Sequence, residues 1–169
     1  MTEAQQRQPY HVLFVCTHNS ARSIMAEALL NQLGAGRFVA HSAGSHPAAR
    51  VHPLALHTLE VLQCSSAGLR SKDWAEFAAP GAPTLDFVFT VCDKAAGETC
   101  PVWPGQPMTA HWGVADPSAV EGTPEQLARV FRDTAVVLKR RIELMLALPM
   151  QALDRLSLQR ELRDIGQRS

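Results

Sequence analysis

A cysteine followed six residues later by an arginine is the feature of this sequence best suited to chemistry. Residues 16–23 read Cys-Thr-His-Asn-Ser-Ala-Arg-Ser and lie between an apolar run and a helical pattern. Backbone N–H groups in such a turn can converge on one anion, and the N-terminus of the following helix adds positive partial charge. Arg22 would complete the site with a planar guanidinium that binds a tetrahedral oxyanion through two hydrogen bonds. The same field would lower the pKa of Cys16 and make its sulfur nucleophilic near neutral pH.

The alternative is that Cys16 is a small apolar residue buried at the end of a strand. A cysteine and an arginine at this spacing also arise often by chance. The context favours the functional interpretation, because a strand pattern precedes the cysteine, a helix pattern follows it, and the residues between are small or polar.

The chain has three more cysteines, Cys64, Cys92 and Cys100. Static disulfides are rare in a reducing compartment, so thiol chemistry or metal binding explains such residues better. Cys64 lies at the end of an expected helix, and we interpret it as structural. Zinc is the alternative for Cys92 and Cys100, although no close Cys-x-x-Cys or His pair accompanies them.

Cys92 follows an expected strand, which would place it at the same edge of a parallel sheet as Cys16. Cys100 comes eight residues after Cys92. In a helix the two would be about 12 Å apart by rise alone, whereas a disulfide needs Cα atoms within about 7 Å. A bond between them therefore requires residues 93–99 to form a loop or to rearrange, and the Gly- and Pro-rich composition of 97–107 predicts a loop.

Alternating strands and helices would position these residues. Apolar and β-branched runs predict strands, and helical spacing with capping signals predicts helices. The expected strands are 11–15, 37–41, 85–91 and 108–112, and the expected helices are 21–33, 53–62 and 123–149. This alternation implies an α/β fold with a parallel sheet and a ligand site at the carboxyl ends of its strands, where Cys16 lies. We expect a tail over 1–9, one catalytic domain over 10–148 and a helical C-terminal appendage over 149–169.

Composition restricts the class of protein further. The chain has 169 residues, 46% of them hydrophobic, with sixteen basic residues balancing sixteen acidic ones. Such a chain can bury a core, and its net charge argues against nucleic-acid or membrane binding. The apolar run at 12–15 is too short for a signal or a membrane span, so we expect a cytoplasmic protein.

Residues 14–27, Phe-Val-Cys-Thr-His-Asn-Ser-Ala-Arg-Ser-Ile-Met-Ala-Glu, resemble the signature of the low-molecular-weight protein tyrosine phosphatase superfamily. The thioredoxin-coupled arsenate reductases are one branch of it. The likeness extends over roughly residues 11–147. It continues through Ser-Ala-Gly at 42–44, Val-Cys at 91–92, His-Trp-Gly at 111–113 and Asp-Pro at 116–117. The implied fold is a three-layer sandwich with a four-stranded parallel sheet of flavodoxin-like order.

The resemblance implies a role for each matching residue. Cys16 would be the nucleophile, Arg22 the oxyanion clamp, and Asp116 the general acid that protonates the leaving oxygen. Ser23 would donate a hydrogen bond to the thiolate, and Asn19 would hold the loop in its strained shape. The oxyanion would be bound by Thr17, His18, Asn19, Ser20, Ala21, Arg22 and Ser23. Without the other motifs, Asp116 would be interpreted as a turn aspartate.

The spare cysteines distinguish the branches. Arsenate reduction needs two electrons, so further thiols must attack the arsenylated cysteine and end as a disulfide. In the reductase branch a cysteine pair occupies the place of Cys92 and Cys100, which implies that Cys92 attacks Cys16, releases arsenite and is then resolved by Cys100. The reductant would be thioredoxin, or glutaredoxin with glutathione.

A phosphatase that hydrolyses phosphoesters is the alternative enzyme, and an arsenical- or phosphate-sensing module is the non-enzyme alternative. The phosphatase branch places aromatic residues beside the acid, whereas here Ser118 follows Asp116-Pro117. His111 and Trp112 could still line the pocket. The acid at Asp116 argues against the sensing module.

Some members of the superfamily bind a potassium ion that stiffens the loop. The matching positions here are Asn19, Glu27, Ser42 and Asp73, and no other cofactor is expected.

Overall fold

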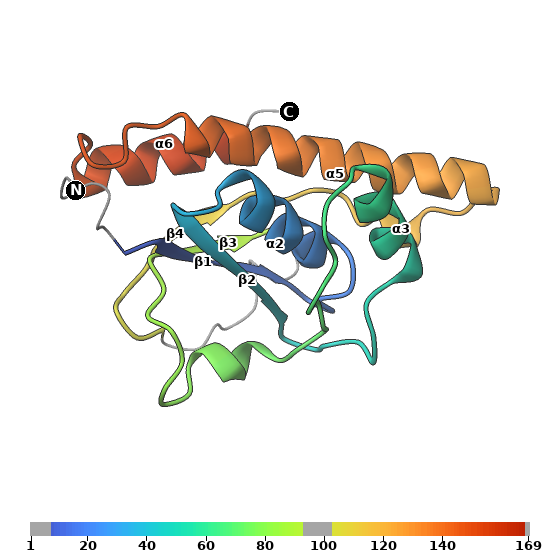
Figure 1. Ribbon diagram of the computed structural model, residues 1–169, viewed down its shortest axis with the longest axis horizontal. Helices are drawn as coiled ribbons and strands as arrows, with labels where there is room; N and C mark the ends of the chain where they lie inside the picture. Colours follow the sequence, from blue (N-terminus) through green and yellow to red (C-terminus); the bar gives the residue numbers. More distant parts are fainter. Residues whose placement is uncertain (1–7, 93–102, 168–169) are drawn as a thin grey trace.

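Among residues 8–92 and 103–167, which the computed structural model describes, four short strands form a parallel sheet in the order β2-β1-β3-β4 (Figure 1). The strands are β1 (Tyr10–Cys16), β2 (Phe38–Gly44), β3 (Phe87–Thr90) and β4 (Met108–His111). Direction and order confirm the expected flavodoxin-like sheet. β2 continues past the expected end at residue 41, because it pairs with β1 as far as Cys16 opposite Gly44.

Helices cover one face of this sheet. α2 (Arg22–Leu33) packs on β1 and β2, α5 (Pro124–Leu146) on α2, and α3 (Pro53–Val61) on both of these helices. α5 begins with the expected capping box, in which Thr123 and Gln126 each bond the other's backbone N–H. Figure 1 shows these helices above the sheet and the short 3₁₀ helix η1 (Trp74–Phe77) below it.

The C-terminal segment forms α6 (Arg155–Gln167) and packs beside β4. Its Leu158, Leu162 and Ile165 are buried, and the carbonyl of Leu162 accepts a hydrogen bond from Trp112 Nε1 at 2.9 Å. A Cβ on Gly166 would collide with the carbonyl of His111. The helix therefore contributes to the core next to the segment that leaves β4.

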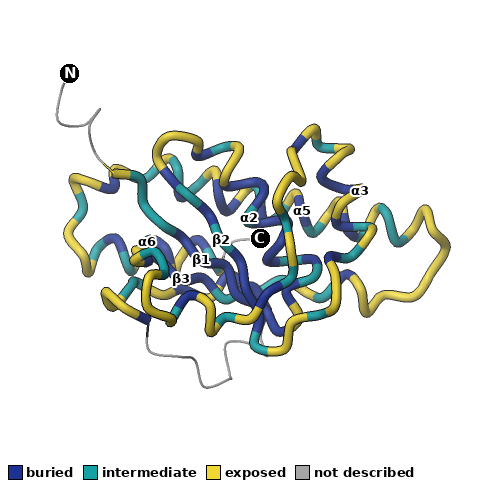
Figure 2. Tube along the Cα trace, turned by 60° about the horizontal axis from the view of Figure 1, so that its bottom comes forward, coloured by how far each residue is buried: buried dark blue, intermediate teal, exposed yellow. Residues whose placement is uncertain are grey.

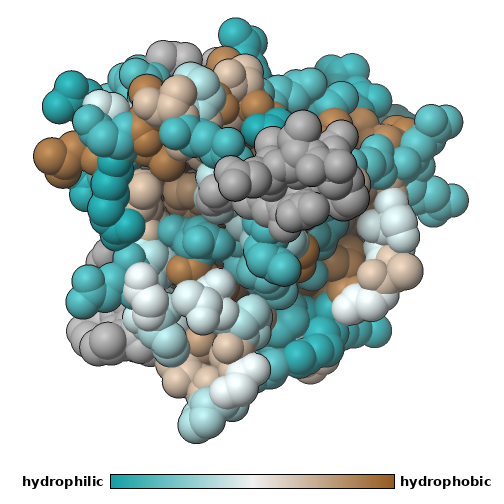
Figure 3. All heavy atoms as spheres, turned by 60° about the vertical axis from the view of Figure 1, so that its left-hand side comes forward, coloured by the Kyte–Doolittle hydropathy of each residue, from teal (hydrophilic) through white to brown (hydrophobic). Residues whose placement is uncertain are grey.

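The polarity of the surface follows from this layering. The central strands are buried, whereas exposed residues lie on the loops and on the outer turns of the helices (Figure 2). The face in Figure 3 is mostly hydrophilic, with smaller apolar areas between. No helix of the described part of the chain is long and apolar enough to cross a membrane.

Candidate active site

The loop between β1 and α2 carries the candidate nucleophile. β1 ends at Cys16 and α2 begins at Arg22. Ala21, the residue that caps α2, makes no side-chain hydrogen bond to the first turn. The first N–H groups of a helix lack partners within the helix. One of them, the N–H of Ser23, is hydrogen-bonded to Cys16, and the helix end that carries these groups favours an anion.

Neighbouring segments bind the loop from its outer side. His46 N donates to the carbonyl of Thr17, Ala48 N to that of His18 and His52 N to that of Ser20, at 2.8–2.9 Å. Since the C=O and N–H groups of one peptide unit point in opposite directions, these contacts turn the N–H groups of His18, Asn19 and Ala21 away from the bonded segments.

Gly44 makes this close packing possible. A Cβ on Gly44 would lie 2.5 Å from the carbonyl oxygen of Thr17 and 2.8 Å from that of Cys16. No side chain fits there. This contact explains why a glycine ends the Ser-Ala-Gly sequence at 42–44.

Asn19 lies inside the loop and holds its shape. Its backbone has a φ of 48°, a left-handed conformation that asparagine tolerates better than most residues. The buried side-chain amide donates to Ser23 Oγ at 2.8 Å and to Ser42 Oγ at 2.9 Å, and its oxygen accepts from Lys72 N at 2.9 Å. One side chain thus links the loop to α2, β2 and the segment before η1.

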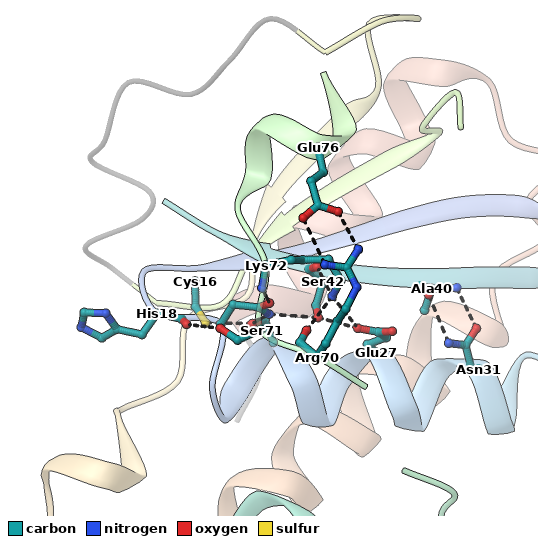
Figure 4. Close-up of polar contacts among 12 residues, drawn as sticks. Cys16, His18, Glu27, Asn31, Ala40, Ser42, Arg70, Ser71, Lys72 and Glu76 are labelled. Carbon is teal, nitrogen blue, oxygen red and sulfur yellow. Dashed lines mark hydrogen bonds and ion pairs between the residues drawn. The ribbon is translucent and has the colours of Figure 1, made fainter. Parts of the chain in front are cut away.

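Ser23 is the side chain that contacts the sulfur. Its hydroxyl oxygen lies 2.8 Å from Cys16 Sγ. Because the amide of Asn19 can only donate to that oxygen, the Ser23 proton is left to be donated to the sulfur. Figure 4 shows Cys16 at the end of the row of polar contacts that runs along α2.

The pKa of Cys16 differs from our expectation. Burial raises the pKa of this thiol, which is only 2% exposed, and outweighs the lowering by the hydrogen bond from Ser23 and by the charge of Arg22. The prediction of a lowered pKa for Cys16 was therefore wrong for the protein without a bound oxyanion. Strand and helix patterns do not show how far the fold removes the sulfur from water.

Replacing Ser23 by alanine should raise the pKa of Cys16 further, because this hydroxyl makes the largest lowering contribution. At pH 7 we expect iodoacetamide to alkylate Cys16 roughly tenfold more slowly, since a hydrogen bond to a charged group is worth about 1.5–3 kcal/mol. The measurement is the alkylation rate against pH, followed by peptide mass spectrometry. Ser66→Ala, at an exposed serine, is the control, and an unchanged profile for Ser23→Ala would exclude this role.

Arg22 and Asp116 form an ion pair at the loop. Arg22 Nη1 donates to the carbonyl of Val114 at 3.1 Å, and Arg22 Nη2 lies 3.6 Å from Asp116 Oδ2. The other carboxylate oxygen of Asp116 accepts from the N–H and hydroxyl of Ser118 at 2.9 and 2.7 Å, which caps the 3₁₀ helix η2 (Pro117–Ala119). Asp116 is therefore both a turn aspartate and a partner of the arginine.

These contacts keep the Asp116 carboxyl ionised. Partial burial raises its pKa, but the two hydrogen bonds from Ser118 and the charges of Arg22 and His18 outweigh burial and hold the pKa below its usual range. To act as an acid, Asp116 must therefore first gain a proton.

Cys92 lies at the same edge of the sheet as Cys16, as its position after β3 predicts. Its sulfur is buried, 3.6 Å from the hydroxyl oxygen of Thr17 in the anion loop. Cys100 and the loop expected over 93–99 lie outside the described residues. Cys64 is buried after α3 and donates its S–H to the carbonyl of Ala28 at 3.3 Å, consistent with a structural residue.

The residues matched to a potassium site do not fit a metal ion. Asp73 points to η1, where its carboxylate accepts from Ala75 N at 2.8 Å. The ammonium of Lys72 already lies among Glu27 and the carbonyl of Ser42. Burial raises the pKa of Glu27 and lowers that of Lys72, and each charge counteracts the shift of the other. Within residues 8–92 and 103–167, no three His, Cys, Asp or Glu side chains are placed to hold a metal.

The two aromatic positions that could line the pocket have different environments. Trp112 is fully buried and stacks on Phe89 with 4.1 Å between ring centroids. His111 is exposed and its Nδ1 lies 2.7 Å from Thr90 Oγ1. The Trp112 ring is therefore not available to sandwich a phenyl group beside Asp116.

Sequence reasoning missed Arg141, a buried arginine on α5. Its Nη1 donates to the carbonyls of Trp112 and Gly113 at 2.7 and 3.0 Å, immediately before the segment that carries Val114 and Asp116. Only its position beside Ile142 on the inner side of a long amphipathic helix could have indicated this contact.

Comparison with known proteins agrees with this geometry. The family described as low molecular weight phosphotyrosine protein phosphatase matches residues 11–159. The glutaredoxin arsenate reductase of Synechocystis sp. is 32% identical over 80% of this chain and 95% of its own length.

Two solved structures are similar as well. An arsenate reductase in the phosphate-binding state has a TM-score of 0.65 and 32% identity, over 79% of this chain and 94% of that one. A thioredoxin-dependent arsenate reductase from Corynebacterium glutamicum has a TM-score of 0.56 and 27% identity, over 84% of this chain and 66% of that one.

Proposed function

The chain belongs to the low molecular weight phosphotyrosine protein phosphatase family, and we propose that within this family it is an arsenate reductase. The observation that carries the proposal is the position of Cys92, beside Thr17 of the anion loop that begins with Cys16. A phosphatase needs the loop, the arginine and the aspartate. A second buried cysteine at the same sheet edge is what the redox reaction needs in addition, and hydrolysis makes no chemical use of it.

The loop would bind the arsenate oxygens. The N–H groups of residues 17–23 and the guanidinium of Arg22 would replace water around the oxyanion and pull charge away from arsenic. Cys16 would then form an S–As bond while a water molecule leaves, with its proton supplied through Asp116. The raised pKa of Cys16 fits an entering arsenate dianion, which can accept the thiol proton and make the sulfur nucleophilic.

The reduction itself would use two further thiols. Cys92 attacks Cys16 Sγ, an S–S bond forms, and the S–As electron pair stays on arsenic, which leaves as arsenite. Cys100 then attacks Cys92, frees Cys16 and completes the disulfide Cys92–Cys100. An external thiol reductant, thioredoxin or glutaredoxin with glutathione, would return this disulfide to two thiols.

The test couples the purified protein to NADPH through thioredoxin with its reductase, and separately through glutaredoxin with glutathione and its reductase. We expect NADPH oxidation that depends on arsenate in at least one system. Hydrolysis of p-nitrophenyl phosphate, run beside it, measures the alternative activity. Phosphoester hydrolysis without arsenate-dependent NADPH oxidation in either system would overturn the proposal in favour of a phosphatase.

A further inference from the structure

Lys72 is a nearly buried lysine behind the anion loop. Its side chain is 8% exposed, and its ammonium lies 3.7 Å from Glu27 Oε1. Nζ also donates to the carbonyls of Ser42 at 2.8 Å and Arg70 at 2.9 Å. Figure 4 shows Lys72 between Cys16 on one side and Glu27 on the other. A buried ammonium with two carbonyl oxygens and a carboxylate is fully engaged.

The contacts run without a break from this ammonium to the sulfur. Ser42 Oγ donates to Glu27, and the amide of Asn19 donates to Ser42 Oγ and to Ser23 Oγ. Ser23 in turn contacts Cys16 Sγ. Ser42 has one hydroxyl proton, which it donates to Glu27 while that carboxylate is ionised, and its oxygen accepts from the Asn19 amide. The positive charge beside Glu27 therefore favours the ionised carboxylate and keeps Ser42 as its donor. The bonds from Asn19 to Ser23 and on to the sulfur follow from the amide, which can only donate.

Lys72 acts on the loop through its backbone too. Its N–H donates to the side-chain oxygen of Asn19, and its carbonyl accepts from Gly44 N at 2.9 Å. The backbone of Lys72 thus bonds Asn19 in the loop and Gly44 at the end of β2. An ion free in solution could supply the charge but not these backbone bonds.

We propose that Lys72 is a positioning residue whose ammonium takes the place of a bound monovalent cation, holds Glu27 and Ser42 in place, and so fixes the position of the Asn19 amide that bonds Ser23 beside Cys16. The site consequently needs no potassium ion. This inference deepens the proposed function, but its readouts are thiol reactivity and thermal stability. It can therefore fail or succeed independently of arsenate reduction.

The main variant is Lys72→Met, which keeps the chain length and removes the charge. We expect Cys16 in this variant to alkylate about fivefold more slowly at pH 7, because the Glu27–Ser42 contacts that fix Asn19, and through it Ser23, lose their countercharge. Lys139→Met, a lysine on the long helix α5, controls for the loss of one charge and should alkylate as the unchanged protein does. Equal alkylation of Cys16 in Lys72→Met and in the unchanged protein would overturn the proposal.

A thermodynamic cycle keeps the test informative if Lys72→Met unfolds easily. Removing one partner of a buried pair leaves an unpaired buried charge. Lys72→Met with Glu27→Gln should therefore melt at a higher temperature than Lys72→Met alone. A double variant no more stable than the single one would show that the two charges do not interact.

A third measurement compares melting temperatures in salts of different cations. The melting temperature of the unchanged protein should be the same in potassium chloride and in choline chloride. Lys72→Ala, which leaves space as well as an unpaired carboxylate, should regain stability in potassium or methylammonium chloride but not in choline chloride. Stabilisation of the unchanged protein by potassium over choline would overturn the statement that Lys72 replaces the ion.

Discussion

Replacing Cys92 by serine should abolish repeated reduction of arsenate and leave phosphoester hydrolysis within about threefold of the unchanged protein. Serine matches the size of cysteine but cannot attack Cys16 or carry away two electrons. The hydrolytic machinery of Cys16, Arg22 and Asp116 stays complete. The measurements are arsenate-dependent NADPH oxidation with the active coupling system and p-nitrophenyl phosphate hydrolysis on the same preparation. We expect at least a 10³-fold loss in the first assay.

Cys64→Ser is the matched control, because Cys64 is a buried thiol bonded to a helix carbonyl. It should retain both activities at a somewhat lower melting temperature. Mass spectrometry after one arsenate turnover should show Cys92 joined to Cys100 with Cys16 reduced. Normal multiple-turnover reduction by Cys92→Ser would exclude the relay. A product joined as Cys16–Cys92 under native conditions would mean that an external thiol resolves it without Cys100.

Replacing Arg22 by lysine should lower kcat/KM for arsenate and for p-nitrophenyl phosphate together, by about 10²–10³-fold. This is the usual effect of removing one oxyanion donor. Lysine retains the positive charge but loses the planar fork that can bind two oxygens at once. It would also lose the contact of the guanidinium with the carbonyl of Val114, which orients the side chain toward Asp116.

Arg37→Lys is the control for this substitution, because Arg37 is an exposed arginine that also donates to a backbone carbonyl, that of Leu146. It should leave both activities unchanged. Protection of Cys16 from iodoacetamide by inorganic phosphate provides a second measurement. Protection should need a much higher phosphate concentration in Arg22→Lys. Equal protection in Arg22→Lys and the unchanged protein would show that the backbone N–H groups alone bind the oxyanion.

The Cys92→Ser and Arg22→Lys results distinguish two steps of the proposed reaction, the attack on the oxyanion and the later redox step. Arg22 belongs to the step shared with phosphatases, so its loss should affect both reactions. Cys92 belongs to the redox step, so its loss should affect one. A chain that lost both activities in Cys92→Ser would instead point to a packing role for the sulfur that lies against Thr17.

The pattern around Cys16 was sufficient to predict the central element of the site. A strand, a loop of small and polar residues and a helix that begins near Arg22 are local features, because each depends on hydrogen bonds and side-chain spacing within a few residues. The capping box at Thr123 is local in the same way. The alternation of such elements was sufficient to predict the parallel sheet, and hence that Cys92 and Cys16 share an edge.

Other features depended on contacts between residues far apart in the chain. Lys72 bonds Asn19 across 53 residues, and Arg141 bonds Trp112 across 29. No periodicity or motif marks either residue, and the expected cation ligand Asp73, next to Lys72, turned toward η1 instead. The placement of α6 against Trp112 was likewise decided by packing.

The sequence by itself determined the order of the elements and the placement of Cys16 in a loop between a strand and a helix, because short-range hydrogen bonding and hydrophobic spacing encode them. Only the tertiary structure decided how strongly burial opposes ionisation of Cys16 and which charge lies behind the loop. Desolvation and buried ion pairs depend on every segment that surrounds a group, and those segments come together only when the chain folds.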